Sequence, residues 1–359
     1  MDGLASLPAT ALQRLADGLR TYRGMAHKQD IQAAVTTLAD AVPAPFRHAG
    51  STLAVGDDCA ALPDGDGYLL FAIEGFLSDF VAAEPWFAGW CGLMVNLSDI
   101  AAMGGRPLAV VDALWSRDDA LAVPIMQGLR AASQAYGVPV VGGHSNTHAG
   151  SEQLAVSVLG RARRLLTSFD AQAGDHLLMA IDLRGHWHDP YPFFDAATSA
   201  PPARLQSDLA LLPALAEAGL CRAAKDISMA GIVGTAAMLM ECSGLGGEID
   251  LARLPCPAGT GAGAGAGADA DADSDSDSDS GQFERWLRVF PSYGYLLAVN
   301  EAHLGQVLQH FQAQGIACAA IGHFDDSRCV RVRRGEHCAE VWNLAAQALT
   351  GCPAPGLGI

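Results

Sequence analysis

Two adjacent carboxylates in Gly56-Asp57-Asp58 come directly after a predicted strand, where the glycine permits a tight turn. Carboxylates a few ångströms apart repel by about 4 kcal/mol at an effective dielectric constant of about 20, so a cation between them is favourable. An aspartate pair that only forms a turn is the alternative interpretation. The pair is therefore a candidate metal site, and its interpretation depends on the residues that accompany it.

Further acidic and amide side chains occur at the end of one predicted strand and along one predicted helix. Glu74 ends the strand, and Asp79 is a nearby rival for the same role. Asn96 and Asp99 are three residues apart, so they share one face of an otherwise apolar helix. Buried polar side chains need partners, and hydrated Mg²⁺ or a metal-bound phosphate would provide one. A helix cap or a core hydrogen bond is the alternative.

Two glycine-containing segments could bring backbone N–H groups close to a phosphate. The first is Gly-Gly-His-Ser at 142–145, which follows a predicted strand. The second is Lys-Asp-Ile-Ser at 225–228, which is followed by Gly231 and Gly234 and is predicted to open a helix. The N-terminus of a helix attracts anions, although Asp226 as a simple N-cap is the alternative.

Apolar periodicity predicts the elements that position these residues. Strands are expected at 51–55, 68–73, 108–114, 138–141 and 153–160, with helices near 86–103 and 118–136. A second cycle has expected strands at 176–181, 294–299, 317–321 and 329–333, with helices near 205–216, 227–242 and 301–314. Strands and helices mix without a strict βαβ repeat, which indicates two α+β domains with a boundary near 162–174.

The composition excludes a wholly disordered chain, because 50% of the 359 residues are apolar. A formal net charge of −17 argues against nucleic acid or an anionic membrane as partners. Six aspartates lie in one Gly/Ala and Asp/Ser tract at 258–281, which predicts a disordered insert and leaves −11 elsewhere. The nine cysteines include no C-x-x-C pair, and no segment is typical of a signal peptide or a membrane span, so we expect a cytoplasmic protein.

Five segments together resemble one superfamily: GDDCAALP (56–63), FAIEGF (71–76), GLMVNLSDIAAMGGRPLAV (92–110), GVPVVGGHSNT (137–147) and KDISMAGIVGTAAMLMECSG (225–244). This superfamily contains aminoimidazole ribonucleotide (AIR) synthetase, thiamine-monophosphate kinase, selenophosphate synthetase and a hydrogenase-maturation dehydratase. The resemblance covers about residues 50–330, and NLSDIAAMG with an upstream GDD is its most specific part.

The resemblance implies a two-domain α+β fold of the AIR synthase type. Its N-terminal domains pair across a homodimer to form a sheet barrel, and its C-terminal domain is a mixed sheet with helices. We therefore expect a helical extension at 1–48, an ATP-binding and dimerisation domain at 49–163, and a C-terminal domain at 172–345 that contains the insert at 258–281. The expected cofactors are ATP and Mg²⁺, and the expected partners are a small-molecule substrate and a second copy of the chain.

Carried over residue by residue, the resemblance implies three groups of site residues. The implied metal ligands are Asp57, Asp58, Glu74, Asp99 and Asp226. The implied nucleotide contacts are Asn96, Gly142, Gly143, Ser145, Asp226 and Ser228. Lys28 and His144 are implied as catalytic residues that contact phosphate.

Several motifs of this chain differ from those of the better-known branches of the superfamily, and these differences narrow the choice of activity. Ile73-Glu74 replaces the usual Thr-Asp, and residues 292–296 replace the acidic segment of the thiamine-monophosphate kinase branch. His144-Ser145, after the two glycines, matches the motif of the selenophosphate synthetase branch. Segment 23–28, however, contains a lysine but lacks the catalytic Cys or selenocysteine of that branch. The chain thus resembles the AIR synthase-related proteins, which implies Mg-ATP-dependent phosphorylation of an oxygen of an amide, carboxylate or related acceptor. A nucleotide-binding scaffold without turnover and a kinase resembling thiamine-monophosphate kinase are the alternatives.

The aromatic segment 186–195 is either part of a substrate pocket or a packed surface loop.

Overall fold

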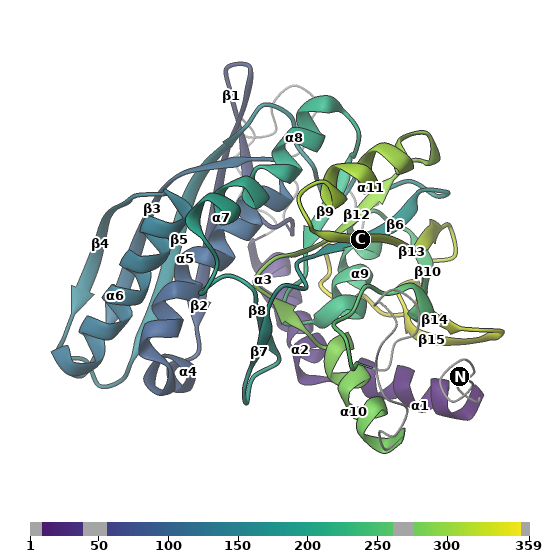
Figure 1. The fold of residues 1–359 in the computed structure, drawn as a ribbon, viewed down its shortest axis with the longest axis horizontal. Coiled ribbons are helices and arrows are strands. Elements are labelled where there is room, and N and C mark those ends of the chain that lie inside the picture. The colour runs from purple at the N-terminus through teal and green to yellow at the C-terminus, as the bar shows by residue number, and fades with distance from the viewer. Residues whose placement is uncertain (1–8, 39–55, 261–275, 353–359) are drawn as a thin grey trace. The chain divides into compact units, whose positions relative to one another are not determined.

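The computed structural model describes residues 9–38, 56–260 and 276–352 of the chain (Figure 1). Its residues form two compact units. Unit 1 comprises Met1–Asp57, Thr167–Ala196 and Leu220–Ile359, and unit 2 comprises Asp58–Leu166 and Ala197–Gly219. Both units combine helices with sheets, so the prediction of two α+β parts is confirmed. The strand predicted at 51–55 lies outside the described residues.

Unit 2 is built on a five-stranded sheet with the strand order β1-β2-β5-β3-β4. The strands are β1 (Ala60–Asp64), β2 (Gly67–Phe76), β3 (Arg106–Trp115), β4 (Val140–Asn146) and β5 (Gln153–Ala162). Neighbouring strands are antiparallel, except for β3 and β4, which are parallel. The α6 helix described next joins these two, as a parallel connection requires a crossover.

Five helices of unit 2 are described: α4 (Ser78–Ala83), α5 (Pro85–Ala102), α6 (Asp119–Tyr136), α7 (Pro202–Leu209) and α8 (Leu211–Ala218). The one helix predicted at 205–216 is in fact α7 and α8, divided at Ala210. The division places Pro213 in the first turn of α8. The backbone N–H groups of a first turn have no acceptor within the helix, so a proline there removes no helical hydrogen bond. Helices α5 and α6 approach closely through glycines, because a Cβ at Gly128 would overlap the carbonyl oxygen of Trp86.

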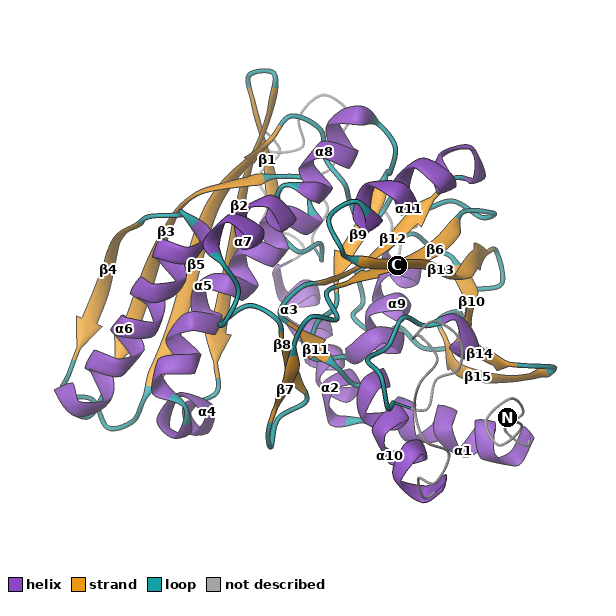
Figure 2. Ribbon diagram, viewed as in Figure 1, coloured by secondary structure: helices purple, strands orange, loops and turns teal. Residues whose placement is uncertain are grey.

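The two faces of the unit 2 sheet differ in what covers them. Helices α5 and α6 lie along one face, as Figure 2 shows, and strand residues that point there are buried, among them Leu70, Val156 and Leu114. Side chains alternate along a strand, so the neighbours of these residues point to the other face. Large apolar side chains are exposed among those neighbours, in particular Phe71, Ile73, Val111 and Leu159.

Unit 1 is built on a seven-stranded mixed sheet with the order β15-β14-β10-β13-β6-β12-β9. The strands are β6 (His176–Ile181), β9 (Ala223–Asp226), β10 (Gly246–Asp250), β12 (Gly294–Val299), β13 (Ala317–Asp325), β14 (Cys329–Arg334) and β15 (His337–Asn343). A small second sheet contains β7 (His186–His188), β8 (Phe193–Asp195) and β11 (Phe290–Pro291). The predicted strands at 176–181 and 294–299 match β6 and β12 to the residue.

The helices of unit 1 are α1 (Ala9–Arg20), α2 (Arg23–Ala26), α3 (Ile31–Leu38), α9 (Gly231–Cys242), α10 (Ser276–Leu287) and α11 (Leu304–Gln312). Every residue of α9 is buried. Helix α1 packs its apolar side, with Leu12 and Leu19, into the core. The Arg20 guanidinium then donates to the carbonyl oxygens of Val341 (2.7 Å) and Glu340 (3.1 Å) on edge strand β15, so α1 covers an edge that would otherwise be open.

The aromatic segment at 186–195 forms the hairpin β7–β8 and packs against α10. The Trp187 ring meets the Trp286 ring edge to face, with the centroids 5.9 Å apart. The Arg285 guanidinium lies 4.0 Å from the Trp187 centroid and donates to Asp189 at 2.6 Å. Packed aromatic contacts account for this part of the segment. Helix α10 begins at Ser276, inside the tract predicted to be a disordered insert, while residues 261–275 of that tract lie outside the described residues.

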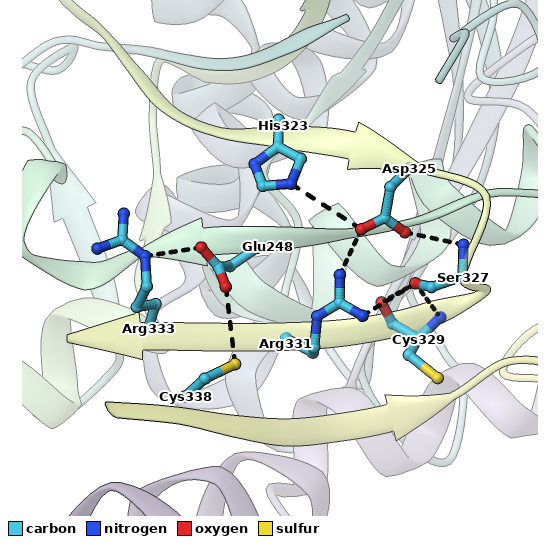
Figure 3. A network of polar contacts seen from close by, with 8 residues as sticks. All are labelled: Glu248, His323, Asp325, Ser327, Cys329, Arg331, Arg333 and Cys338. Atoms are coloured by element: carbon cyan, nitrogen blue, oxygen red, sulfur yellow. Dashed lines mark hydrogen bonds and ion pairs between the residues drawn. The ribbon is translucent and has the colours of Figure 1, made fainter. Parts of the chain in front are cut away.

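The outer face of strands β10, β13 and β14 carries a network of compensating charges (Figure 3). Arg333 donates to Glu248 and Asp250, each at 2.7 Å, and Arg331 pairs with Asp325. Arg331 and Arg333 both belong to this ion-paired face. Arg334, the next residue on β14, is buried with its guanidinium 5.0 Å from the Phe283 ring. Within the described part of the chain, every helix is too short or too polar to cross a bilayer.

Candidate functional site

Asp58 and Asp99 come together within unit 2. Asp58 lies in the bend before β1, and Asp99 is a buried residue in the last turns of α5. A carboxylate oxygen of one lies within 4.8 Å of a carboxylate oxygen of the other. At that distance two negative charges repel by about 3–4 kcal/mol at an effective dielectric constant of about 20. Oxygen ligands from two carboxylates are the donor set that Mg²⁺ prefers, so the pair fits a shared divalent cation.

Asn96 lies one turn before Asp99 on the same helix and is fully buried. Its side-chain nitrogen donates to the carbonyl oxygen of Gly92 at 2.8 Å, which fixes the orientation of the amide. The side-chain oxygen has no hydrogen-bond donor among the described residues. A buried acceptor without a donor costs free energy, so this oxygen suits a metal ion, its water shell or a nucleotide hydroxyl.

Glu74 is exposed near the end of β2, on the strand face that the helices cover. Strand β1 begins at Ala60 opposite Phe71, so Asp58, two residues earlier, lies toward the end of β2 that carries Glu74. The sheet register thus brings the bend with Asp58 and the carboxylate of Glu74 to the same edge of unit 2. This placement agrees with the predicted role of Glu74 as a third carboxylate, which stays a prediction.

Asp112 is a buried carboxylate that the sequence reasoning missed. It lies on β3 in the same cross-strand row as Glu74, with Val156 of β5 between them. Burial raises the pKa of the Asp112 carboxyl, and Oδ2 has no hydrogen-bond partner among the described residues. A Cβ at Gly143 would overlap the Asp112 carboxylate, so the glycine makes room for it. The feature of the sequence that could have pointed to Asp112 is a single aspartate within an otherwise apolar predicted strand.

The segment Gly142-Gly143-His144-Ser145 belongs to β4, an exposed edge strand that continues beyond the predicted end at residue 141. It continues as a strand because β3 pairs with it in parallel, with Ala113 opposite His144. The His144 ring lies 5.9 Å from the Trp115 ring, on the sheet face opposite α5. Asn96 and Asp99 are on α5, so His144 and these residues occupy different sides of the unit 2 sheet.

Asp57, the neighbour of Asp58, is held within unit 1. Its two carboxylate oxygens accept from the backbone N–H (3.0 Å) and the hydroxyl (2.7 Å) of Ser168. The Lys225 ammonium nitrogen lies 3.5 Å from the same hydroxyl oxygen and is buried. Ser168 was not predicted as a site residue, because it lies in the expected domain boundary, 111 residues from Asp57. Lys225 belongs to the predicted segment 225–228, in which only Asp226 and Ser228 were given roles.

Asp226 and Ser228 lie between a strand and a helix of unit 1. The prediction that a helix opens at Ile227 is wrong by four residues. Asp226 is the last residue of β9, and α9 begins at Gly231, because β9 is ordered by pairing with β12. Ser228 belongs to the connecting turn, where its backbone N–H donates to the Thr235 hydroxyl at 3.2 Å.

Lys28 lies in a short 3₁₀ helix, His27–Asp30, that follows α2 in unit 1. The preceding segment packs against the turn before α9, because a Cβ at Gly24 would overlap the carbonyl oxygen of Met229. The Met25 side chain is buried beside Gly234. The fold therefore brings the segment with Lys28 next to the turn that contains Ser228, two sequence regions that were identified separately.

Comparison with known families matches most of the chain. Residues 56–162 match AIR synthase related protein, N-terminal domain, and residues 179–334 match AIR synthase related protein, C-terminal domain. The chain belongs to the AIR synthase related protein family. The predicted superfamily and its two-domain fold are therefore confirmed for this AIR synthase related protein.

Individual relatives extend this finding. The AIR synthase related protein described here is 44% identical over 334 residues to the uncharacterized protein sll0787 of Synechocystis sp., a match that covers 93% of this chain and 96% of sll0787. It shares its fold with Thermotoga maritima PurL complexed with ATP, at a TM-score of 0.63 and 18% identity over 84% of this chain and 47% of PurL. It shares its fold also with AaThiL complexed with AMPPCP and TMP, at a TM-score of 0.60 and 19% identity over 86% and 93% of the two chains. The chain thus spans about half the length of the PurL chain.

Proposed function

We propose that this protein is a Mg-ATP-dependent enzyme that phosphorylates an oxygen of a small-molecule amide, carboxylate or related acceptor. The observation that carries the proposal is the pairing of Asp58 and Asp99 within 4.8 Å in unit 2. Bound magnesium would offset the repulsion between these carboxylates and neutralise the charge of a polyphosphate. PurL is complexed with ATP and AaThiL with AMPPCP and TMP, which supports a nucleotide ligand for this fold.

The proposed roles follow the geometry within each unit. In unit 2, Asp58, Asp99 and Glu74 are proposed as metal ligands, and Asn96, Gly142, Gly143 and Ser145 as nucleotide contacts. Asp57 already has both oxygens bound by Ser168, so we assign the direct metal contact to Asp58 and give Asp57 the role of fixing the turn. Asp226 as a further metal ligand, Ser228 as a nucleotide contact, and Lys28 as a phosphate contact are proposed from the sequence motifs. His144 lies on the sheet face opposite α5, so within one copy we give it no contact with a phosphate bound at Asp58 and Asp99.

Catalysis by such a site rests on placement and charge rather than on covalent chemistry by the protein. The acceptor oxygen must approach the terminal phosphorus in line with the leaving oxygen, and carboxylates that fix the metal fix that line. Positively charged and N–H groups aimed at the transferring phosphoryl group stabilise its charge. Lys28 supplies the cation in this proposal.

Isothermal titration calorimetry with Mg-ATP tests the metal assignment. Asp99→Asn keeps the size of the side chain and removes one charge, so we expect affinity for Mg-ATP to fall at least about 100-fold. Asp119→Asn is the matched control, because Asp119 is an exposed carboxylate in the first turn of α6 in the same unit, and we expect this variant to bind Mg-ATP as the wild type does. Unchanged binding by Asp99→Asn refutes the assignment.

Phosphate release in the presence of candidate acceptors tests turnover. We expect ATP consumption that depends on both magnesium and an acceptor with an amide or carboxylate oxygen. A protein that binds Mg-ATP without consuming it with any acceptor is a nucleotide-binding scaffold, and the proposed enzyme is then refuted. Turnover with thiamine monophosphate would instead identify a kinase similar to thiamine-monophosphate kinase.

We further propose a homodimer in which the uncovered faces of two unit 2 sheets meet. Phe71 and Leu159 are opposite each other in the register, and Ile73 and Val111 flank Ser157 in the next row of the same face. All four of these apolar side chains are exposed in the monomer, with Ile73 at 65%. Contiguous exposed apolar side chains on one sheet face mark an interaction surface.

A further inference from the structure

The segment that follows β15, Leu344–Cys352, is fastened to helix α9 by one buried carboxylate; we call this segment the C-terminal strap. The Glu241 side chain accepts from the backbone N–H groups of Leu349 and Thr350, each at 2.7 Å, and from the Thr350 hydroxyl at 2.6 Å. The N–H of Gly351 adds a longer contact of 3.4 Å. Charge-assisted bonds of this kind are stronger than neutral ones, so Glu241 is the main anchor of the strap.

Two further side chains hold the strap from other directions. The Gln32 side-chain amide, on α3, donates to the carbonyl oxygens of Ala348 and Leu349, each at 3.0 Å. The Trp342 indole, on β15, donates to the carbonyl oxygen of Gln347 at 2.8 Å. The strap is thus tied to elements from the beginning, middle and end of the chain, all within unit 1.

The last described residue of the strap packs directly on the acidic turn. A Cβ at Gly56 would overlap both Cβ and Sγ of Cys352. Gly56 has a φ of 113°, a backbone conformation that favours glycine, so turn and strap fit only with this residue. On α9, Cys242 follows Glu241, and its sulfur lies 3.8 Å from the carbonyl oxygen of Gly56. Ser168 then binds both oxygens of Asp57, as described above.

We propose that Glu241 is a positioning residue for the metal site: it fixes the C-terminal strap, the strap and α9 fix Gly56 and Asp57, and the direction of this turn sets where Asp58 stands. The inference rests on the proposed function, because Asp58 matters only as a metal ligand. Glu241 itself touches neither substrate nor metal in this scheme. Its effect must therefore appear in the magnesium dependence.

Glu241→Gln is the most direct test. It keeps the shape of the side chain but replaces one acceptor oxygen with an NH₂ group, which cannot accept a hydrogen bond from the N–H groups of the strap. Glu248→Gln is the matched control, since it makes the same change in the same unit, on the charged face of strand β10 (Figure 3), where Glu248 pairs with Arg333. Gln32→Ala is a milder second variant that loosens the strap from its half-buried outer side without altering α9.

Two measurements are made on each full-length variant. The first is the magnesium concentration that gives half-maximal ATP binding at fixed ATP. We expect this magnesium concentration to rise about tenfold in Glu241→Gln and less in Gln32→Ala, and to stay unchanged in Glu248→Gln, while metal-free ATP binding stays the same in all three variants.

The second measurement is the alkylation rate of Cys352 by iodoacetamide, followed by peptide mass spectrometry without metal. Burial raises the pKa of this thiol, so wild-type labelling is slow, and we expect it to rise about tenfold in Glu241→Gln and measurably in Gln32→Ala.

The outcomes separate the two hypotheses. Wild-type protein that binds no Mg-ATP refutes the proposed function, and the positioning role with it. Wild-type binding together with an unchanged magnesium dependence in Glu241→Gln and Gln32→Ala refutes the positioning role alone. Faster Cys352 labelling without a magnesium effect shows a strap that only stabilises the fold, which also overturns the inference. If Glu241→Gln does not fold, Gln32→Ala decides.

Discussion

Phe71→Arg on the uncovered face of the unit 2 sheet is expected to dissociate the proposed homodimer. Full burial of a large apolar side chain stabilises by about 1.5–3 kcal/mol, and Phe71 is 51% exposed, so an interface that covers it gains about 0.8–1.5 kcal/mol per copy. A two-fold interface contains each residue twice, so the loss is about 1.5–3 kcal/mol, or about 10–150-fold in Kd. Desolvation of two arginines adds to this loss, which makes the figure a lower bound.

Sedimentation velocity over a range of concentrations measures this directly. Val123→Arg is the control, because Val123 is equally exposed at 50% but lies on α6, which covers the other face of the sheet. We expect wild type and Val123→Arg to sediment as dimers under conditions in which Phe71→Arg is monomeric. A wild-type monomer, or a Phe71→Arg variant that sediments as the control does, would refute the reasoning from the uncovered face.

Two further predictions concern stability. Asp112→Asn should raise the melting temperature relative to wild type at pH 8, and this advantage should shrink as the pH falls toward 4. The folded protein raises the pKa of this buried carboxyl, so the stability that the protonated form contributes is present at low pH and is lost as the pH rises through the folded-state pKa; an advantage independent of pH would contradict this. Gly128→Ala should destabilise by about 1–3 kcal/mol, because its Cβ would overlap the Trp86 carbonyl oxygen and push α5 and α6 apart, whereas Gly150→Ala, with no atom nearby, should change the melting temperature little in the same thermal scan.

The sequence predicted those elements whose own residues carry a strong apolar pattern. Strands β6 and β12 and the long helices α5 and α6 are of this kind. It did not predict β9, because Ala223–Asp226 has no alternation and becomes a strand only by pairing with β12. For the same reason it ended the strand before Gly142, although parallel pairing with β3 keeps Gly142 and Gly143 extended.

The candidate site was predictable to the extent that its residues belong to local motifs. Asp58 and Asp99 were both named from such motifs, and unit 2 brings their carboxylates together. The partners of these motifs were not predictable, because they depend on contacts over long sequence distances. Glu241 bonds to residues more than 100 positions away, and in the sequence it is only one polar residue near the end of an apolar helix.

The contact between Arg20 and β15 can form only late in synthesis, because its two partners lie far apart in the chain. Helix α1 leaves the ribosome early, whereas Val341, which its arginine binds, is made 321 residues later. Unit 2, in contrast, has all of its residues available once Gly219 has emerged. Since compact units fold during synthesis as their residues become available, unit 2 completes its fold while unit 1 still lacks most of its sheet. The apolar side of α1 stays uncovered throughout that interval, so chaperone binding to nascent chains should concentrate on α1 and end only when β15 has been made.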